Sequence, residues 1–471
     1  FSSTGVLTYS VYAKAGSVNG IRLRIDTNSD ADGFFNLVNG TIFQSSGIDA
    51  SIEDVGSGWY RCSVSQNVAG PVKLQFFTTN GTTSYDNGYI YIQDAQLEQG
   101  LVATPYIETG ASTAQAGILE NTPRFDYSGG ATCPSLLLEP SRTNLVVQSE
   151  NIGNWWLWSN VTALNNQGIS PEGVNNAAKI TLLSTGAGVI YRTSVAIGNG
   201  VLSFFAKPET LSTGSRVRVS VDGIGAAYWN IDGTLNAVTG GTAENGESYG
   251  NGWFRFSYNV PSGSVVNYGV QGGAIGDTML VYGMQVEASA SYATSYIPTY
   301  GVSQTRARDL AYKTGVSSLI GQTEGTLFVD FDLLSLDGFS GIIDINTALT
   351  TSAKRVLLWE TSAAKLQANF GTQAPLIDWN TPTIGRNKVV IIYSASICKL
   401  FANGVKIGES STSGSFSGLD VVSYVCAGGG VNFQKKNIHQ TLLFPTALSD
   451  LDAEILTGAT TYNTFAAMAL A

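Results

Sequence analysis

The densest aromatic cluster in the chain lies at residues 154–158, which read Asn-Trp-Trp-Leu-Trp. Flat aromatic faces stack on the apolar C–H face of a pyranose ring, so such a cluster favours sugar binding. If the segment is a strand, alternation places Trp156 and Trp158 on one face and Trp155 on the other. We therefore predict Trp156 and Trp158 as glycan-binding residues, with packing or subunit contact as the alternative role, and Trp155 as a core residue.

One acidic loop has the spacing of an oxygen-ligand metal site. Asn28, Asp30 and Asp32, followed by a glycine, match the first half of a calcium-binding loop, in which side-chain oxygens alternate along the chain. That loop pattern calls for a glutamate near position 39, where this chain has Asn39. The segment makes calcium a candidate cofactor bound by Asn28, Asp30 and Asp32, with an acidic hairpin turn as the alternative.

Residues for glycan hydrolysis are sparse. The reaction needs two carboxylates about 5–9.5 Å apart, facing one bond, and the sequence has no Glu-x-Asp-x-x-Glu strand motif to supply them. Asp330 and Asp332 share a strand face by alternation, which a solvated outer face also explains. His439 is the only histidine, and no Gly-x-Ser-x-Gly motif provides a nucleophile. We therefore predict that the chain is not an enzyme.

Composition excludes further classes of function. The chain has 471 residues, enough for about three domains, and its net charge of −10 disfavours binding to nucleic acid or to anionic membranes. No apolar run approaches the length of about 18 residues that a transmembrane helix needs, so we predict no membrane insertion. Charged residues make up only 13%, while aromatic residues and glycines are abundant, which suits short strands and tight turns.

The first two thirds of the sequence contain an internal repeat. Five segments recur in the same order: 6–14 as 201–207, 35–41 as 229–234, 56–63 as 250–257, 95–98 as 284–287, and 103–107 as 293–297. A solenoid needs at least three short repeats, whereas two long copies indicate duplication of a domain. Trp59 and Trp253 recur within this pattern, each two residues before an arginine, and we interpret them as structural anchors.

Both copies have the pattern of β-sandwiches. Ile21, Leu23 and Ile25 alternate with polar residues, so one face of that strand is apolar. Asn-Gly and Asp-Gly pairs mark hairpin turns at short intervals, as in jelly rolls. The predicted domains are a jelly-roll module, a linker, a second jelly-roll module and a C-terminal sandwich, at residues 1–110, 111–137, 138–312 and 313–471.

The two copies differ in what precedes them. Residues 138–200 come before the matching strand of the second copy, whereas almost nothing comes before Val6 in the first. A sandwich without those strands would expose strand edges and half of a core. We therefore expect either that natural sequence precedes Phe1 or that another chain supplies the missing strands.

The last third predicts a different sandwich. Residues 325–333 alternate as a strand, and 387–407 read as strands with a hairpin turn at Asn403-Gly404. Ser449 and the acidic residues after it predict the N-cap of the only substantial helix.

Two groups of segments resemble a signature of bacteriophage virion fibre and tail proteins. The first comprises Cys133-Pro-Ser-Leu-Leu-Leu-Glu-Pro-Ser-Arg-Thr-Asn-Leu145, Ser149-Glu-Asn151 and Asn154-Trp155, and the second Gln285-Val-Glu287, Ala293-Thr-Ser-Tyr-Ile-Pro-Thr299 and Thr305-Arg306. In that family they bracket a jelly-roll domain similar to carbohydrate-binding modules. The last third resembles concanavalin A-like or laminin G-like domains in the segments 325–333, 401–405 and 448–454.

This resemblance implies an all-β virion surface protein, extracellular and part of a head or tail fibre, with two tandem jelly-roll modules followed by a concanavalin A-like sandwich. It implies attachment to a host cell-surface glycan, contact with other virion proteins, and a homo-oligomer, with a trimer favoured. Two alternatives from other classes stay open: a structural fibre or decoration protein, and a secreted glycan hydrolase or lyase.

Overall fold

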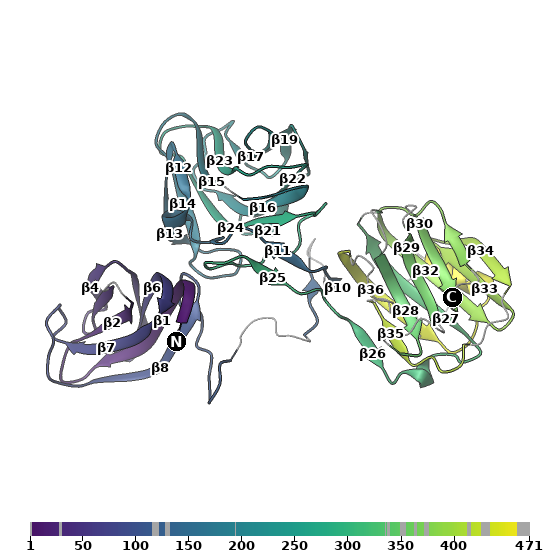
Figure 1. Ribbon diagram of the computed structural model, residues 1–471, viewed down its shortest axis with the longest axis horizontal. Coiled ribbons are helices and arrows are strands. Elements are labelled where there is room, and N and C mark those ends of the chain that lie inside the picture. Colours follow the sequence, from purple (N-terminus) through teal and green to yellow (C-terminus); the bar gives the residue numbers. More distant parts are fainter. Residues whose placement is uncertain are drawn as a thin grey trace. The chain divides into compact units, whose positions relative to one another are not determined.

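The protein is built almost entirely of antiparallel β-strands, as the sequence predicts (Figure 1). The computed structural model describes residues 2–27, 31–114, 122–127, 132–193, 195–334, 336, 340–348, 355–361, 365–371, 376–411, 416–424 and 434–458. The chain divides into two compact units. Unit 1 comprises Phe1–Ala116 and Arg142–Arg306, and unit 2 comprises Gly117–Ser141 and Ala307–Ala471.

Residues 1–116 of unit 1, here called module 1, form two four-stranded sheets with the orders β5-β6-β1-β8 and β4-β3-β2-β7. Their strands are β1 (Ser2–Ala15), β2 (Gly20–Asp26), β3 (Asp32–Asn36), β4 (Thr41–Ser46), β5 (Asp49–Gly56), β6 (Trp59–Pro71), β7 (Lys73–Thr79) and β8 (Ile90–Gln99). Ile21, Leu23 and Ile25 are fully buried between the sheets, which confirms the predicted alternation.

Residues 142–306, here called module 2, form a larger sandwich. Its sheets have the orders β12-β15-β23-β17-β18-β19 and β13-β14-β24-β16-β22-β20, with β21 beside β22, and a short β11–β25 pair joins the two ends of the module. The elements are β11 (Arg142–Asn144), α1 (Ile152–Trp155), β12 (Leu157–Ser159), β13 (Val161–Gly168), β14 (Ala177–Leu182), β15 (Gly186–Arg192), β16 (Gly200–Pro208), β17 (Arg216–Val221), β18 (Gly225–Asn230), β19 (Leu235–Val238), β20 (Thr242–Ala243), β21 (Glu247–Gly250), β22 (Trp253–Val260), β23 (Val266–Gly273), β24 (Thr278–Ala288) and β25 (Gln304–Arg306).

The strand registers confirm that the two modules are copies of one design. Trp59 begins β6 and Trp253 begins β22, and each strand pairs with the equivalent partner, β1 or β16. Arg61 and Arg255 follow on the same strands, and each guanidinium group lies 5.3 Å from the centre of an aromatic ring on that partner. The repeated Trp-x-Arg pattern is therefore structural, as predicted.

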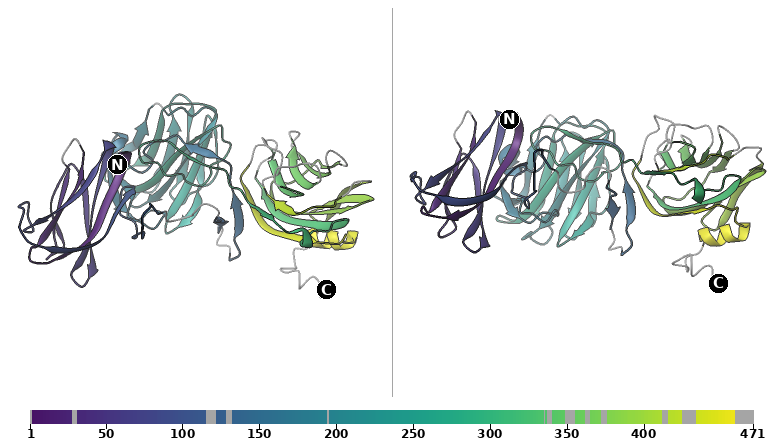
Figure 2. Two further views of the ribbon diagram at one scale, coloured as in Figure 1. Left: turned by 60° about the horizontal axis from the view of Figure 1, so that its bottom comes forward. Right: turned by 90° about the horizontal axis from the view of Figure 1, so that it is seen from below.

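Unit 2 is a two-sheet sandwich with the orders β34-β33-β32-β27-β36-β10-β9 and β26-β35-β28-β29-β30-β31. Figure 2 shows α2, in yellow, on the outer side of the first of these sheets, where Ala453 packs against Val390 and Phe401. Ser449 Oγ accepts a hydrogen bond from Asp452 N–H at 3.1 Å, as predicted for an N-cap. The elements are β9 (Phe125–Asp126), β10 (Ser135–Leu138), β26 (Tyr312–Thr314), η2 (Ser317–Leu319), β27 (Glu324–Leu333), β28 (Ser340–Asn346), β29 (Arg355–Thr361), β30 (Lys365–Phe370), β31 (Leu376–Trp379), β32 (Gly385–Ser394), β33 (Ile397–Ala402), β34 (Val405–Ser411), β35 (Val421–Ser423), β36 (Lys436–Phe444) and α2 (Asp450–Gly458).

The boundaries in the structure differ from those predicted. Residues 117–141 belong to unit 2, although 111–137 were expected to be a linker and 138 the start of the second module. β10 pairs with β36, and Leu138 is buried in the core of unit 2. A short apolar strand suits either sandwich, so its sequence does not reveal which sheet it joins. None of the helices in the described residues is long and apolar enough to cross a membrane.

Candidate functional site

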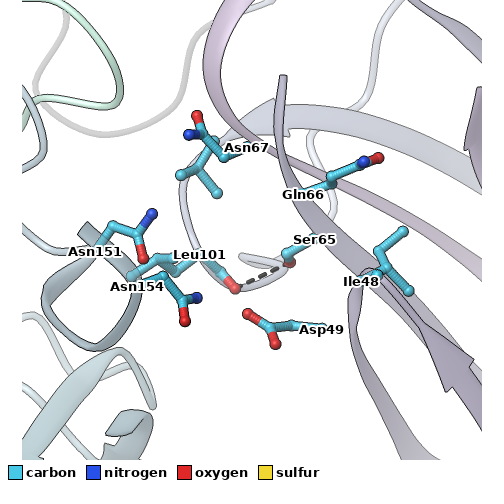
Figure 3. A pocket seen from close by; sticks show the side chains of 10 residues that line it. Ile48, Asp49, Ser65, Gln66, Asn67, Leu101, Asn151 and Asn154 are labelled. Carbon is cyan, nitrogen blue, oxygen red and sulfur yellow. Dashed lines mark hydrogen bonds between the residues drawn. The ribbon is translucent and has the colours of Figure 1, made fainter. Parts of the chain in front are cut away.

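An open cleft of about 370 Å³ lies within unit 1, between residues of module 1 and the start of module 2 (Figure 3). Amide side chains dominate its polar lining, and one carboxyl group is present. Ten residues line it: Val6, Gly47, Ile48, Asp49, Ser65, Gln66, Asn67, Leu101, Asn151 and Asn154.

Turns and strand centres of module 1 form one wall of this cleft. Gly47 lies in the turn between β4 and β5 with a φ of 67°, a left-handed conformation that favours glycine. This turn places Asp49 at the start of β5. Ser65 is on β6, and its Oγ donates a hydrogen bond to the carbonyl oxygen of Leu101 at 3.0 Å, which holds the segment after β8 against the sheet.

Module 2 supplies the other wall through α1. Asn151 precedes this single helical turn and Asn154 lies within it. Figure 3 shows these two side chains facing Ile48 and Asp49 across the cleft. Asn165 Nδ2 donates to Asn151 Oδ1 at 2.8 Å, so the Asn151 side chain is held in place with its amide N–H groups left to donate.

Two further amides add hydrogen-bonding groups. Gln148 Nε2 donates to Asn67 Oδ1 at 3.3 Å, which leaves the Asn67 amide N–H groups as donors. Gln66 Oε1 is buried without a hydrogen-bond partner among the described residues.

Asp49 is the only charged residue among the ten that line the cleft. The side chain is exposed at the mouth, yet the surrounding walls remove part of its hydration, and this loss raises the pKa of its carboxyl group. With no cation in the lining, the cleft repels anionic ligands when Asp49 is ionised. The arrangement therefore suits a neutral ligand rich in hydroxyl groups.

Glu150, the residue directly before the cleft residue Asn151, has a fully buried carboxyl group. Glu150 Oε1 accepts hydrogen bonds from the hydroxyl groups of Tyr282, Tyr296 and Tyr300 at 3.2, 3.1 and 3.0 Å. Burial raises the pKa of Glu150 to about 7, the negative charge of Glu172 adds to the increase, and the tyrosine hydroxyl groups oppose it. This cluster anchors the segment that leads into α1.

Trp156 does not lie where the sequence predicts. It is only 3% exposed, its ring packs edge-on against Tyr268 with centroids 5.6 Å apart, and its Nε1–H donates to the carbonyl oxygen of Gln148. The predicted alternation fails because residues 152–155 form a helical turn and the strand begins only at Leu157. Trp156 is therefore a core residue and cannot stack on a sugar. The side chain of Trp155 lies outside the described part of the chain.

Trp158 keeps the exposure that a sugar platform requires. It lies on β12, the border strand of its sheet, opposite Ile190, and is 42% exposed. Leu157 beside it is also exposed, but its side chain points to the opposite face of the strand. Trp158 stays a candidate glycan-binding residue.

The structure contradicts the calcium prediction at Asp32. Arg22 Nε and Nη2 donate to its two carboxylate oxygens at 2.8 and 2.6 Å, and Arg24 binds the same oxygens at 2.7 and 3.0 Å. Partial burial favours a higher pKa, but the two guanidinium groups hold the pKa of Asp32 below its usual value. Both oxygens are engaged, so Asp32 is not available as a ligand. Asn28 and Asp30 lie outside the described residues.

The carboxylates of β27 are also paired. Asp330 is buried rather than solvated, because Arg386 covers it with two hydrogen bonds of 2.9 Å. Asp332 contacts His439 Nε2 at 2.9 Å, so the single histidine forms a contact between neighbouring strands. No group of three or more potential metal-binding side chains occurs among the residues that the structure describes.

The residues that line the cleft were missed in the sequence. Their only local signal is a concentration of amides at 65–67 and 151–154, which surface loops share. The fibre-like signature, by contrast, has structural roles: Asn144 Nδ2 donates to the carbonyl oxygens of Met284 and Ile297, and the hydroxyl groups of Thr143 and Thr305 lie 2.7 Å apart.

The fold and the cleft define a protein of several β-sandwich modules with an open, amide-rich site. No family model and no curated protein matches the chain. Solved structures that are similar include the CBM40 module of a Ruminococcus gnavus IT-sialidase bound to α2,3-sialyllactose, with 19% identity and a TM-score of 0.27 over 30% of this chain and 86% of that one.

Two further similar structures cover more of the chain. Domains LG4-5 of the mouse laminin α1 chain show 10% identity and a TM-score of 0.23 over 62% of this chain and 96% of that one. A Trypanosoma rangeli sialidase in complex with sialic acid shows 12% identity and a TM-score of 0.25 over 93% and 92%. The all-β assignment rests on the strands of this chain.

Proposed function

We propose that this chain is a bacteriophage virion surface protein, part of a head or tail fibre, that attaches to a host cell-surface glycan without catalysis. The observation that carries glycan binding is the cleft lined by Asn67, Asn151 and Asn154. Amides supply paired donors and acceptors, which match the hydroxyl groups of a sugar. The virion assignment rests on the fibre-like signature in the sequence.

The cleft favours one class of glycan over another. Asp49 gives it a single negative charge, and no lysine or arginine is among its lining residues. A carboxylated sugar such as sialic acid would therefore meet repulsion rather than an ion pair. The proposed ligand is a neutral glycan held by hydrogen bonds, with Trp158 as a separate stacking surface.

The same lining argues for binding rather than hydrolysis. Glycosidases need two carboxylates across one bond, and the cleft has only Asp49. The proposal includes contacts with other virion proteins and a homotrimer, which light scattering would test.

Isothermal titration of the full chain with neutral oligosaccharides from host polysaccharide tests the proposal. We expect Asn154→Ala and Asp49→Ala each to weaken binding at least about tenfold, which corresponds to roughly 1.4 kcal/mol. Asn236→Ala, an exposed asparagine on β19 outside the cleft, serves as the matched control and should bind as the parent chain does.

Three outcomes would count against the proposal in different ways. Equal binding by all three variants would place the site elsewhere. Failure of every host glycan to bind would remove the adhesive role and favour the structural fibre or decoration protein. Release of reducing ends from the polysaccharide would favour the hydrolase or lyase.

A further inference from the structure

Strands β7 and β8 are the border strands of the two sheets of module 1. Within the described residues, β7 pairs with β2 and β8 pairs with β1, and the outer sides carry only one bridge, between Thr79 and Tyr85. The equivalent strands of module 2, β23 and β24, are interior strands: β15 pairs with β23, and β14 pairs with β24. The two modules therefore differ in whether these edges are covered (Figure 1).

Equivalent positions on β7 and β23 show what the open edge leaves exposed. Phe76 pairs with Leu23 in module 1, and Tyr268 pairs with Val219 in module 2. Phe76 is 46% exposed, whereas Tyr268 is 0% exposed. Both side chains lie on the core-facing side of their sheet. Tyr268 is covered by neighbouring residues of module 2, whereas Phe76 is left exposed in module 1.

The other sheet shows the same difference. Ile92 on β8 pairs with Ala13, and Val281 on β24 pairs with Ala206, with a register shift at the equivalent place in both strands. Ile92 is 39% exposed and Val281 is 0% exposed. The unpaired backbone N–H and C=O groups of a border strand are a template for pairing with another strand, and the exposed Ile92 adds an apolar side chain that such a strand would cover.

In module 2 the cover comes from the segment directly before β16. Trp156 packs on Tyr268, and Ile180 of β14, which pairs with Met279 of β24, is fully buried. This segment supplies two strands to each sheet, β12 and β15 to one and β13 and β14 to the other. The next strand along the chain is β16.

We propose that β7 and β8 accept a four-stranded segment of the same polypeptide, N-terminal to β1, that pairs with them as β15 and β14 pair with β23 and β24. Because the two modules are duplicates, the segment should resemble β12–β15 of module 2. We therefore expect it to place alternating apolar residues beside Ile92 and a large apolar side chain over Phe76. Its position before β1 follows from the strand order of module 2, where the covering strands lead directly into β16. A second copy is a poorer donor, because its own β12–β15 are paired within its module 2.

Hydrogen–deuterium exchange tests this proposal on the full chain with and without the gene-encoded residues upstream of Phe1. The amides of β23 and β24 serve as internal controls and should be protected in both proteins. We expect the outward-facing amides of β7 and β8 to exchange rapidly in the 471-residue chain and at least about tenfold more slowly in the extended one. Unchanged exchange, or a gene that encodes no such segment, would overturn the proposal.

Substitutions distinguish burial by this segment from pairing between copies. Ile92→Ser should barely change the melting temperature of the 471-residue chain but should lower that of the extended chain, whereas Val281→Ser should lower both. If the 471-residue chain instead dimerises and protects β7 and β8 by itself, as shown by light scattering and exchange, the occupant is a second copy and the proposal fails. These readouts do not involve glycan, so they are independent of the proposed adhesive function.

Discussion

The carboxylate of Glu287 accepts two hydrogen bonds from Thr294, one from the backbone N–H at 3.0 Å and one from the hydroxyl group at 2.5 Å. Glu98 and Thr104 repeat this arrangement in module 1, at 3.0 and 2.5 Å. In both copies a glutamine two residues before the glutamate donates to it and accepts a backbone N–H from farther along the chain. The repeated Gln-x-Glu and Ala-Thr motifs therefore fasten the segment after the last strand of each module to that strand.

Thr294→Val should destabilise module 2, because it removes a hydroxyl donor from a buried carboxylate. A hydrogen bond to a charged group contributes about 1.5–3 kcal/mol, and we expect a loss of that size in urea unfolding. Thr242→Val, on an exposed edge strand, is the matched control and should have little effect. Equal stability of both variants would show that the hydrogen bond between the Thr294 hydroxyl group and Glu287 makes no measurable contribution to the free energy of unfolding.

Glu150 should make unit 1 less stable as the pH rises. Its pKa is about 7 in the folded protein, above the usual 4.5, so the folded state binds the proton more tightly than the unfolded state does. The contribution of Glu150 to the stability of unit 1 is then largest below pH 4.5, falls between pH 4.5 and 7, and is smaller by about 3 kcal/mol above that range. Urea midpoints measured across this range check the direction.

Glu150→Gln should flatten that pH dependence. The amide is neutral at every pH, and Asn176 Oδ1, which is buried without a partner in the described residues, can accept its N–H after the Asn176 amide turns over. Tyr300→Phe is a useful second variant, since it removes one donor to the carboxylate but keeps the carboxyl group. If the urea midpoints of the parent chain and of E150Q change equally with pH, the pH dependence of stability comes from other groups.

The two tryptophans should respond in opposite ways to truncation. Trp156→Ala leaves a cavity beside Tyr268 and should lower the free energy of unfolding by about 3–5 kcal/mol. Trp158→Ala removes an exposed side chain and should leave the thermal melt nearly unchanged. If Trp158 is a sugar platform, attachment to host cells weakens in that variant; unaltered attachment would exclude Trp158 as a glycan-binding residue.

Calcium removal should leave the melting temperature of the chain unchanged, because arginines occupy both oxygens of Asp32. Asp32→Ala should instead lower stability with or without calcium, since it leaves the buried Arg22 without its partner, at a loss of about 3–5 kcal/mol. Thermal melts with added calcium and with chelator provide the comparison. A shift of the parent melt on chelation would show that calcium binds the chain through other residues.

Features that depend on local pattern could be predicted from the residues alone. Alternation at Ile21, Leu23 and Ile25 specified a buried strand face, because side chains of a strand point to opposite sides in turn. The ordered repeats predicted two related modules, since similar segments in the same order form equivalent strands, as in the pairs β1–β6 and β16–β22. Ser449 specified a helix start through a hydrogen bond within one turn.

Contacts between segments that are distant in the chain became visible only in the folded protein. Asp49 and Asn154 line one cleft because strand pairing and the module 2 helical turn bring them together, and neither segment carries a periodic signal for the other. Trp156 and Trp158 were predicted to share a strand face. Trp156 is instead buried and Trp158 exposed, because the helical turn α1 comes first and the strand begins only after Trp156. β10 likewise joined unit 2 because β36 offered an edge there, a choice set by long-range pairing that a short apolar run does not specify.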